Sequence, residues 1–366
     1  MAGSNIFSNL LYSLFRIILE VPENKSREIG APSNILIVRQ HNQFGDMLAG
    51  ISIFRAVKET YPACKLTVIV SPENYSGLVN NKFIDELFIF NKKKISSPAY
   101  FSALHKLLGR QYDAVIVPVT VSISFTSNLL ARLANAKTRI GPLSLNGKPN
   151  KSSFLFDRRV DIDWRKHPDA NVADLILDMI RPFGISTNDF SSEITFGRED
   201  IESAEKFIYS IKENEGMSVI GLHVGAGKIP NRWPLDKFIE LMDRLKKNYG
   251  AAFYLTGSSA DKEEIDYIKT KAGFSAGLFI NRKIPEVAAL ISKSDLFISN
   301  DTGIMHVAGT TKTPQVSIFG PTNPFNWAPI GHNKLFIRKS ELIDDVSVND
   351  VYELCESILI RKATGK

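Results

Sequence analysis

The stretch of residues 296–324 constrains the fold most strongly, because it carries the pattern of a complete strand–helix–strand unit. Its apolar start at 296–298 is typical of a buried parallel strand. Residues 299–303 supply helix-starting side chains and a glycine, and apolar positions within 304–308 predict a short helix. A second apolar run at 316–319 predicts the returning strand. We therefore expect parallel sheets covered by helices.

The start of that helix is a candidate anion site. Free N–H groups and the positive end of the helix dipole would point to the carboxyl end of the preceding strand. Gly303 would let a ligand approach the backbone, and Thr302 adds a hydroxyl. Asp301 repels phosphate, so it would either cap the helix or accept hydrogen bonds from ligand hydroxyls. An ordinary capped helix explains the same pattern equally well.

Length and composition fit two globular domains. The 366 residues suffice for two separate cores, and 44% hydrophobic with 23% charged residues is typical of soluble proteins. A net charge of +6 suits a phosphorylated ligand or an anionic membrane, but without the Lys/Arg clustering of a nucleic-acid-binding protein. Cys64 and Cys355 are too far apart in sequence for a disulfide framework or a zinc site, which favours a reducing cytoplasm.

Residues 5–21 predict an amphipathic helix. One broad face carries the apolar residues Phe7, Leu10, Leu11, Leu14, Ile17, Ile18 and Val21. The run is too short to span a bilayer and is broken by Arg16, and it lacks the features of a signal peptide. Two interpretations stay open: a helix lying on a membrane, or a helix packed on the body of the protein.

Strands and helices alternate from residue 33 to the end of the chain. In the first half we expect strands at 35–38, 66–70, 83–90 and 114–117, a loop at 39–46, and helices at 47–61, 128–135 and 168–183. In the second half we expect strands at 219–222 and 253–255, and helices at 199–214, 235–248, 262–271, 285–293 and 347–361. This alternation predicts two doubly wound domains whose strand carboxyl ends face a cleft.

Four further loops follow predicted strands and could carry chemistry. In the first, Asp46 could remove a proton from a hydroxyl, although a helix N-cap explains this residue more simply. In the second, the small residues of 225–227 suit backbone contact with a diphosphate, and Lys228 and Arg232 could neutralise it. An ordinary glycine-rich turn, with the nearby tryptophan packing, is the alternative.

The other two loops are ambiguous when taken alone. Residues 256–259, with Gly257, could touch a nucleoside or merely turn the chain, and the same holds for the turn at 320–322 with Thr322. His306 lies inside a predicted helix, where a histidine usually packs or forms a hydrogen bond. No cluster has metal-ligand spacing, no phosphate-binding Walker loop occurs, and the single glycine of loop 39–46 argues against a dinucleotide-dependent dehydrogenase.

Taken in order, these loops resemble the ADP-heptose:lipopolysaccharide heptosyltransferases, which form glycosyltransferase family 9. The resemblance runs over residues 34–330 and rests on six motifs: Arg39 with Gly45-Asp46, Arg132-Leu133-Ala134 with Arg139-Ile140-Gly141, His223-Val224-Gly225-Ala226 with Arg232-Trp233-Pro234, Leu255-Thr256-Gly257, Ser299-Asn300-Asp301-Thr302-Gly303 with Met305-His306, and Phe319-Gly320-Pro321-Thr322. One position departs from the family pattern, since Asn231 replaces a frequent lysine. Which cation faces the phosphates therefore stays open.

The resemblance implies an α/β protein of GT-B architecture, with two Rossmann-like doubly wound domains facing a central cleft. It places an acceptor-binding domain at 34–190 and a nucleotide-sugar-binding domain at 191–340, and the amphipathic N-terminal segment at 1–33 precedes them. The helix in 341–366 would be a candidate to cross back to the N-terminal domain.

The resemblance also assigns roles to single residues. Asp46 would be the general base that deprotonates the acceptor hydroxyl. The donor-binding set would be Gly225, Ala226, Gly227, Lys228, Arg232, Gly257, Asp301, Thr302, Gly303, His306 and Thr322. Within it, Asp301 would hold sugar hydroxyls, and Lys228 or Arg232 would offset the charge of the departing ADP.

We therefore expect an inverting, metal-independent glycosyltransferase that moves a heptose, or a related sugar, from ADP-heptose to a lipid-anchored lipopolysaccharide core acceptor. It would use no cofactor beyond the ADP-sugar co-substrate and would bind no nucleic acid. We expect it in the cytoplasm, with peripheral contact to the inner membrane. The alternatives are a nucleotide-sugar epimerase of GT-B fold and a non-catalytic two-lobed ligand-binding protein.

Overall fold

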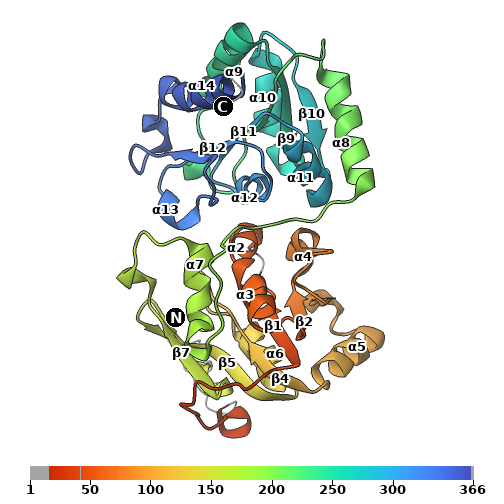
Figure 1. The fold of residues 1–366 in the computed structure, drawn as a ribbon, viewed down its shortest axis with the longest axis vertical. Coiled ribbons are helices and arrows are strands. Elements are labelled where there is room, and N and C mark those ends of the chain that lie inside the picture. The colour runs from red at the N-terminus through yellow and green to blue at the C-terminus, as the bar shows by residue number, and fades with distance from the viewer. Residues whose placement is uncertain (1–15, 42, 364–366) are drawn as a thin grey trace. The chain divides into compact units, whose positions relative to one another are not determined.

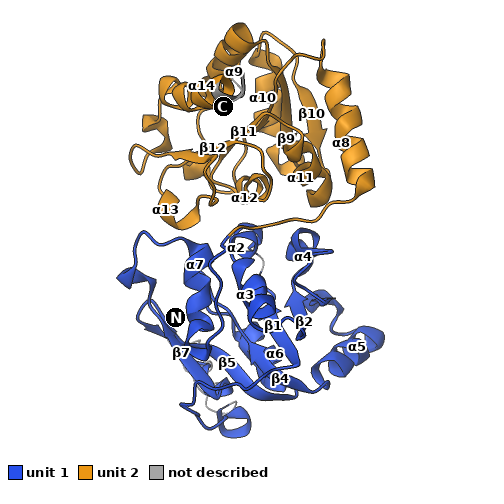
Figure 2. Ribbon diagram, in the orientation of Figure 1, with its two compact units in different colours: residues 1–190 blue, residues 191–366 orange. Residues whose placement is uncertain are grey.

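The computed structural model describes residues 16–41 and 43–363 of the chain. It divides into two compact units, Met1–Phe190 and Ser191–Lys366 (Figure 2). Each unit has its own sheet with helices packed against it (Figure 1). Among the described residues, no helix has the length and apolar character needed to cross a bilayer.

The N-terminal unit contains a seven-stranded sheet in the order β3-β2-β1-β4-β5-β6, with β7 paired to β5. Its strands are β1 (Asn34–Arg39), β2 (Lys65–Val70), β3 (Glu86–Ile89), β4 (Tyr112–Ile116), β5 (Ala136–Leu145), β6 (Lys148–Pro149) and β7 (Arg158–Ile162). Its helices are α2 (Phe44–Ala49), α3 (Ser52–Thr60), α4 (Pro72–Leu78), α5 (Pro98–Leu108), α6 (Phe125–Leu133) and α7 (Val172–Leu175). All neighbours are parallel except β5 and β6, because Asn146 and Gly147 both take the positive φ of a tight hairpin turn.

The C-terminal unit contains six parallel strands in the order β10-β9-β8-β11-β12-β13, the order of a Rossmann sheet. Its strands are β8 (Val219–His223), β9 (Ala252–Gly257), β10 (Gly277–Ile280), β11 (Leu296–Asn300), β12 (Gln315–Ile318) and β13 (Lys334–Ile337). Its helices are α8 (Arg198–Ile211), α9 (Leu235–Tyr249), α10 (Lys262–Lys271), α11 (Ile284–Ser292), α12 (Gly303–Gly309), α13 (Pro324–Trp327) and α14 (Val348–Ala363). The strand order reverses between β8 and β11, and ligands of such sheets bind at the carboxyl ends beside that point.

The last helix belongs to the core of the C-terminal unit. Val351, Cys355 and Leu359 of α14 are buried with Leu241 and Leu245 of α9 in one apolar cluster. Over these residues α14 therefore packs within its own unit.

Two helices of the N-terminal unit differ from the sequence-based expectation. The helix expected at 47–61 is two helices, and α2 already begins at Phe44. The break lies at Gly50, where a Cβ atom would approach the Ile176 side chain to 2.6 Å. The helix expected at 168–183 shortens to α7 followed by 3₁₀ turns, and it ends at Gly184 with a left-handed backbone.

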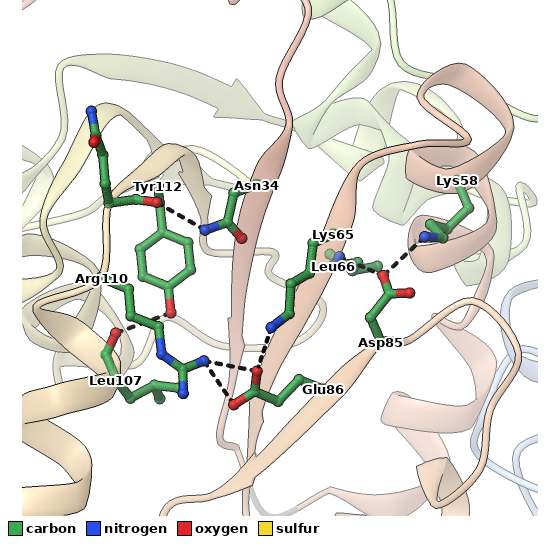
Figure 3. Close-up of polar contacts among 10 residues, drawn as sticks. Asn34, Lys58, Lys65, Leu66, Asp85, Glu86, Leu107, Arg110 and Tyr112 are labelled. Carbon is green, nitrogen blue, oxygen red and sulfur yellow. Dashed lines mark hydrogen bonds and ion pairs between the residues drawn. The ribbon is translucent and has the colours of Figure 1, made fainter.

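Acidic residues at the start of β3 and just before it tie this edge strand to the sheet (Figure 3). Glu86 accepts hydrogen bonds from Arg110 at 2.7 Å and pairs with Lys65 at 2.9 Å. Asp85 accepts from the Leu66 amide at 2.7 Å and pairs with Lys58 at 2.9 Å. These carboxylates are therefore committed to the structure of the sheet, and they lie at the amino end of β3.

Candidate functional site

Asn300 organises the carboxyl edge of the C-terminal sheet. This fully buried residue ends β11, beside the point where the strand order reverses. Its side-chain oxygen accepts a hydrogen bond from the Trp233 amide at 3.1 Å, and its nitrogen donates to the Val224 carbonyl at 2.8 Å. One amide side chain thus fixes both arms of loop 224–233 on the end of β11. The sequence analysis did not assign a role to Asn300, although this residue lies within the motif at 299–303.

Asp301 is oriented by the same loop. The Asn231 side chain donates to the Asp301 carboxylate at 2.8 Å and to its backbone carbonyl at 3.3 Å. Asn231 is buried, whereas Asp301 is half-buried. The N-cap of α12 is Thr302, whose side chain makes no capping hydrogen bond. At the start of α12 the Met305 N–H donates to the Thr302 carbonyl at 3.1 Å, so the N–H groups of Gly303 and Ile304 are the ones that this helix start offers to a ligand.

The glycines of the candidate site serve different purposes. A Cβ atom at Gly225 would lie 2.1 Å from an Asp261 oxygen, and one at Gly257 would lie 2.7 Å from the Ile265 side chain. Close packing thus explains both of these glycines. Gly227, by contrast, is exposed and would have no atom within 4 Å of an added Cβ. Of the three, only Gly227 leaves open space in which a ligand could approach the backbone.

The two candidate cations of this loop differ in their electrostatic balance. Arg232 donates from Nε to the Ala226 carbonyl at 2.8 Å, and its guanidinium pairs with the buried carboxylate of Glu264. Arg232 therefore holds the loop and is already neutralised. Lys228 is exposed and forms no ion pair with any residue in the described parts of the chain. The net positive charge of loop 224–233 is therefore that of Lys228.

His223 and His306, the histidines near this edge of the sheet, are both buried. His306, on the inner side of α12, meets the Trp327 ring edge-on with centroids 6.4 Å apart. Burial lowers the pKa of His306 to about 4. Burial also lowers the pKa of His223, whose Nδ1 lies 3.0 Å from the Thr256 carbonyl. With a pKa of about 4, His306 is uncharged at neutral pH and can serve only as a neutral hydrogen-bonding group.

Thr322 lies on the turn that follows β12. It is half-buried and close in sequence to Asn323, whose side chain caps the first turn of α13. The structure thus brings Asp301, Thr302, Gly303 and Thr322 to the carboxyl ends of the adjacent strands β11 and β12. Loop 224–233 follows β8, the other neighbour of β11.

In the N-terminal unit, Asp46 lies in the first turn of α2 rather than in a loop. Thr120 donates a hydrogen bond to its carboxylate at 3.2 Å and accepts one from the buried Arg39 guanidinium at 3.1 Å. Burial lowers the pKa of Arg39, whereas the nearby Asp46 charge raises it. Because arginine keeps its proton at any physiological pH, Arg39 supplies a fixed positive charge next to Asp46.

A cavity of about 460 Å³ opens beside this network within the N-terminal unit. It is lined by Gln40, His41, Pro72, Glu73, Phe90, Asn91, Lys92, Lys93 and Ser124, which follow the carboxyl ends of β1, β2 and β3 or begin α4 and α6. Burial, and then the positive charges of Arg39 and Lys92, lower the pKa of His41. Lys92 and Lys93 lie exposed on the 3₁₀ turn that follows β3 and line this cavity.

Comparison with known proteins identifies the family. The model of glycosyltransferase family 9 (heptosyltransferase) matches residues 101–352, which is more than half of the chain. The chain belongs to glycosyltransferase family 9. Its fold is the α/β GT-B fold, and it is a glycosyltransferase of the heptosyltransferase type.

Individual relatives share about a quarter of their aligned residues with this family 9 protein. The chain is 25% identical to lipopolysaccharide heptosyltransferase 3 of Escherichia coli over 307 residues, covering 80% of this chain and 85% of that protein. It is 25% identical to lipooligosaccharide heptosyltransferase 2 of Haemophilus influenzae over 329 residues, covering 84% and 89%.

Solved structures of family 9 match nearly the whole chain. The family 9 glycosyltransferase of Veillonella parvula superposes with a TM-score of 0.78 at 18% identity, covering 92% of this chain and all of that one. The E. coli ADP-heptose lipopolysaccharide heptosyltransferase II gives a TM-score of 0.72 at 19% identity, covering 90% and 99%. At these identities the structures show that the fold is shared.

Proposed function

We propose that this family 9 protein transfers a heptose from ADP-heptose to a saccharide of the lipopolysaccharide core, with inversion and without a metal ion. Heptosyltransferases are named among its relatives, and the solved structures similar to it include E. coli WaaC with ADP and with ADP-2-deoxy-2-fluoro heptose. The observation that carries the proposal is the set of backbone, hydroxyl and cationic groups that meet at the carboxyl ends of β8, β11 and β12.

The C-terminal unit would bind the donor. The N–H groups of Gly303 and Ile304 at the start of α12, with the hydroxyls of Thr302 and Thr322, suit the diphosphate oxygens. Gly227 leaves space for close approach, and Lys228 adds a charge that no carboxylate of the described residues neutralises. Asp301, oriented by Asn231, would accept hydrogen bonds from sugar hydroxyls.

The N-terminal unit would supply the general base. Arg39 and Thr120 favour the ionised form of Asp46, which can then accept the proton of the acceptor hydroxyl. The acceptor oxygen forms a bond to the anomeric carbon while the bond from that carbon to the diphosphate oxygen breaks. The electron pair of the broken bond leaves with ADP. A single displacement of this kind inverts the configuration at the anomeric carbon.

We also propose that the cavity of the N-terminal unit receives the acceptor. Lys92, Lys93 and the nearby Arg39 give this cavity a positive potential, which only Glu73 and Asp46 oppose among the charged groups at its lining and in the adjoining network. A saccharide bearing carboxylate or phosphate groups fits such a charge distribution.

Contact with the cytoplasmic face of the inner membrane would bring a lipid-anchored acceptor within reach. Most of the predicted 5–21 helix lies outside the described residues, but Ile17 and Ile18 are 82% and 66% exposed. The chain that follows is fixed to the N-terminal unit, where the Arg132 side chain donates to the Leu19 carbonyl at 2.7 Å. We propose that these isoleucines enter an anionic bilayer surface.

The membrane proposal has a direct test. Replacing Ile17 and Ile18 by serine should reduce co-sedimentation with vesicles containing anionic lipid, while Ile330→Ser, which removes another exposed isoleucine, should not. If the wild type, the variant with both Ile17 and Ile18 replaced, and Ile330→Ser bound the vesicles equally, these two isoleucines would not contact the membrane.

The transfer reaction is tested by incubating the protein with ADP-heptose, with and without a lipopolysaccharide core acceptor, in the presence of a chelator. We expect ADP release only when the acceptor is present, and NMR should show a product with inverted anomeric configuration. Conversion of the donor without acceptor would indicate an epimerase. Intact donor in the presence of both acceptor and free metal ions would indicate a binding protein.

A further inference from the structure

Arg338 is an unbalanced charge at the carboxyl edge of the C-terminal sheet. It directly follows β13 and is half-buried. Its Nε donates to the Gly320 carbonyl at 2.7 Å, so its side chain leans towards the end of the neighbouring strand β12. No carboxylate in the described parts of the chain pairs with it.

The Gly320 carbonyl, which accepts the hydrogen bond from Arg338, lies close to the donor-binding groups. A Cβ atom at Gly320 would be 3.1 Å from the Pro230 carbonyl oxygen, so the turn after β12 packs directly against loop 224–233. The next residue of that loop, Asn231, holds the carboxylate of Asp301. Arg338 is therefore attached to the same group of loops that carries Asp301 and Thr322.

Charge balance separates Arg338 from the other cations of these loops. In the described loops that follow β8, β11, β12 and β13 as far as Ser340, the cations are Lys228, Arg232, Arg338 and Lys339. Arg232 pairs with Glu264, and Lys339 pairs with Asp350 at 2.7 Å. Lys228 and Arg338 remain, and only Arg338 is partly buried and held in place by a hydrogen bond.

We infer that Arg338 is a further donor-binding residue, which contacts the diphosphate of the nucleotide and lowers the free energy of the transition state as ADP departs. This inference rests on the donor site proposed above. With Nε bound to Gly320, the two terminal nitrogens of the guanidinium still offer four N–H groups, enough for a bidentate contact with phosphate oxygens. Adjacent parallel strands are about 4.8 Å apart, so an arginine leaning from β13 over β12 can reach a phosphate bound near Thr322.

The test compares two variants of Arg338 with a neighbouring control. Arg338→Gln removes the charge but keeps a donor for the Gly320 carbonyl, and Arg338→Lys keeps the charge without the planar fork. The control is Lys339→Gln, which removes an adjacent charge that Asp350 already balances. Titration calorimetry measures binding of ADP and of adenosine at low and moderate salt, and thermal unfolding confirms that each variant is folded.

We expect Arg338→Gln to weaken ADP binding by about 10- to 100-fold, as for the loss of a charged hydrogen bond, and to reduce its salt dependence. The adenosine affinity of Arg338→Gln should equal that of the wild type. The ADP affinity of Arg338→Lys should lie between those of the wild type and Arg338→Gln, and that of Lys339→Gln should match the wild type. An equal loss for ADP and adenosine, or no loss, would show that Arg338 only supports the Gly320 turn. Wild-type protein that bound neither compound would instead overturn the donor site itself.

Discussion

Replacing Asn300 by alanine tests most sharply whether this side chain holds the donor loop. The residue is fully buried, so the change leaves two backbone groups without partners: the Trp233 N–H and the Val224 carbonyl. An orphaned buried polar group costs about 1–3 kcal/mol. Water that enters the vacated space could satisfy one of the two. We therefore expect the free energy of unfolding of the C-terminal unit to fall by about 2–4 kcal/mol.

Urea denaturation followed by tryptophan fluorescence measures this loss. With a slope of about 2 kcal/mol per molar urea, the midpoint of the unfolding transition should fall by about 1–2 M. The matched control is Asn333→Ala, which removes a single hydrogen bond to the Lys312 carbonyl at 2.7 Å. Asn333 is half-buried, so water can replace its amide, and the midpoint should barely move.

Ligand binding provides a second measure of the same perturbation. Because the loop carries Asn231 and Lys228, its displacement in Asn300→Ala should also weaken ADP binding. A midpoint equal to that of the wild type, together with unchanged ADP affinity, would refute the idea that Asn300 positions loop 224–233.

Three further predictions concern charge and protonation. In the transfer assay, Lys92→Ala and Lys93→Ala should each raise the KM for an anionic acceptor by about tenfold, as expected for one lost charged contact. Lys94 does not line the cavity, so Lys94→Ala should leave this KM unchanged. The folded pKa of His306, about 4, lies below its ordinary value of 6.5, so the unfolded state binds more protons between these values and stability should fall as the pH drops from 6.5 to 4. Urea titrations across this pH range should show that the free energy of unfolding depends less on pH in His306→Gln than in the wild type. Burial lowers the pKa of Lys334 to about 7 from 10.5, so stability should rise as the pH increases from 7 to 10.5, and Lys334→Met should lack this rise.

Elements with strong local signals were predicted well from the sequence. The helix expected at 262–271 has those bounds in the structure, and the 296–324 unit forms β11, α12 and β12 in the expected order. Their helix-starting residues, apolar periodicity and chain-breaking residues lie within a few positions of one another, so the sequence alone contains the information. The strands β5, β6, β7, β10 and β13, by contrast, were missed, and β6 pairs over only two positions.

Features that depend on distant contacts could not be predicted. The break between α2 and α3 arises where Gly50 packs against Ile176, more than a hundred residues later. In the same way, the sequence left open whether Lys228 or Arg232 faces the phosphates, and the ion pair of Arg232 with Glu264 of α10 could not be foreseen from the motif. Asn231 looked like a simple departure from the family pattern, yet it binds the Asp301 carboxylate. A motif shows which residue types are present, but the structure is needed to show which partners they already have.

The central claim is that Asp46 serves chemistry in one unit while the other unit binds the nucleotide. The most direct measurement pairs the transfer rate with the ADP dissociation constant for Asp46→Asn, with Asp243→Asn, an exposed aspartate of α9, as the control. We expect Asp46→Asn to lower kcat by about 10²–10⁴-fold, the usual contribution of a general base, with nearly unchanged ADP affinity. Wild-type turnover in Asp46→Asn would contradict this role, and loss of ADP binding would contradict the division of labour between the two units.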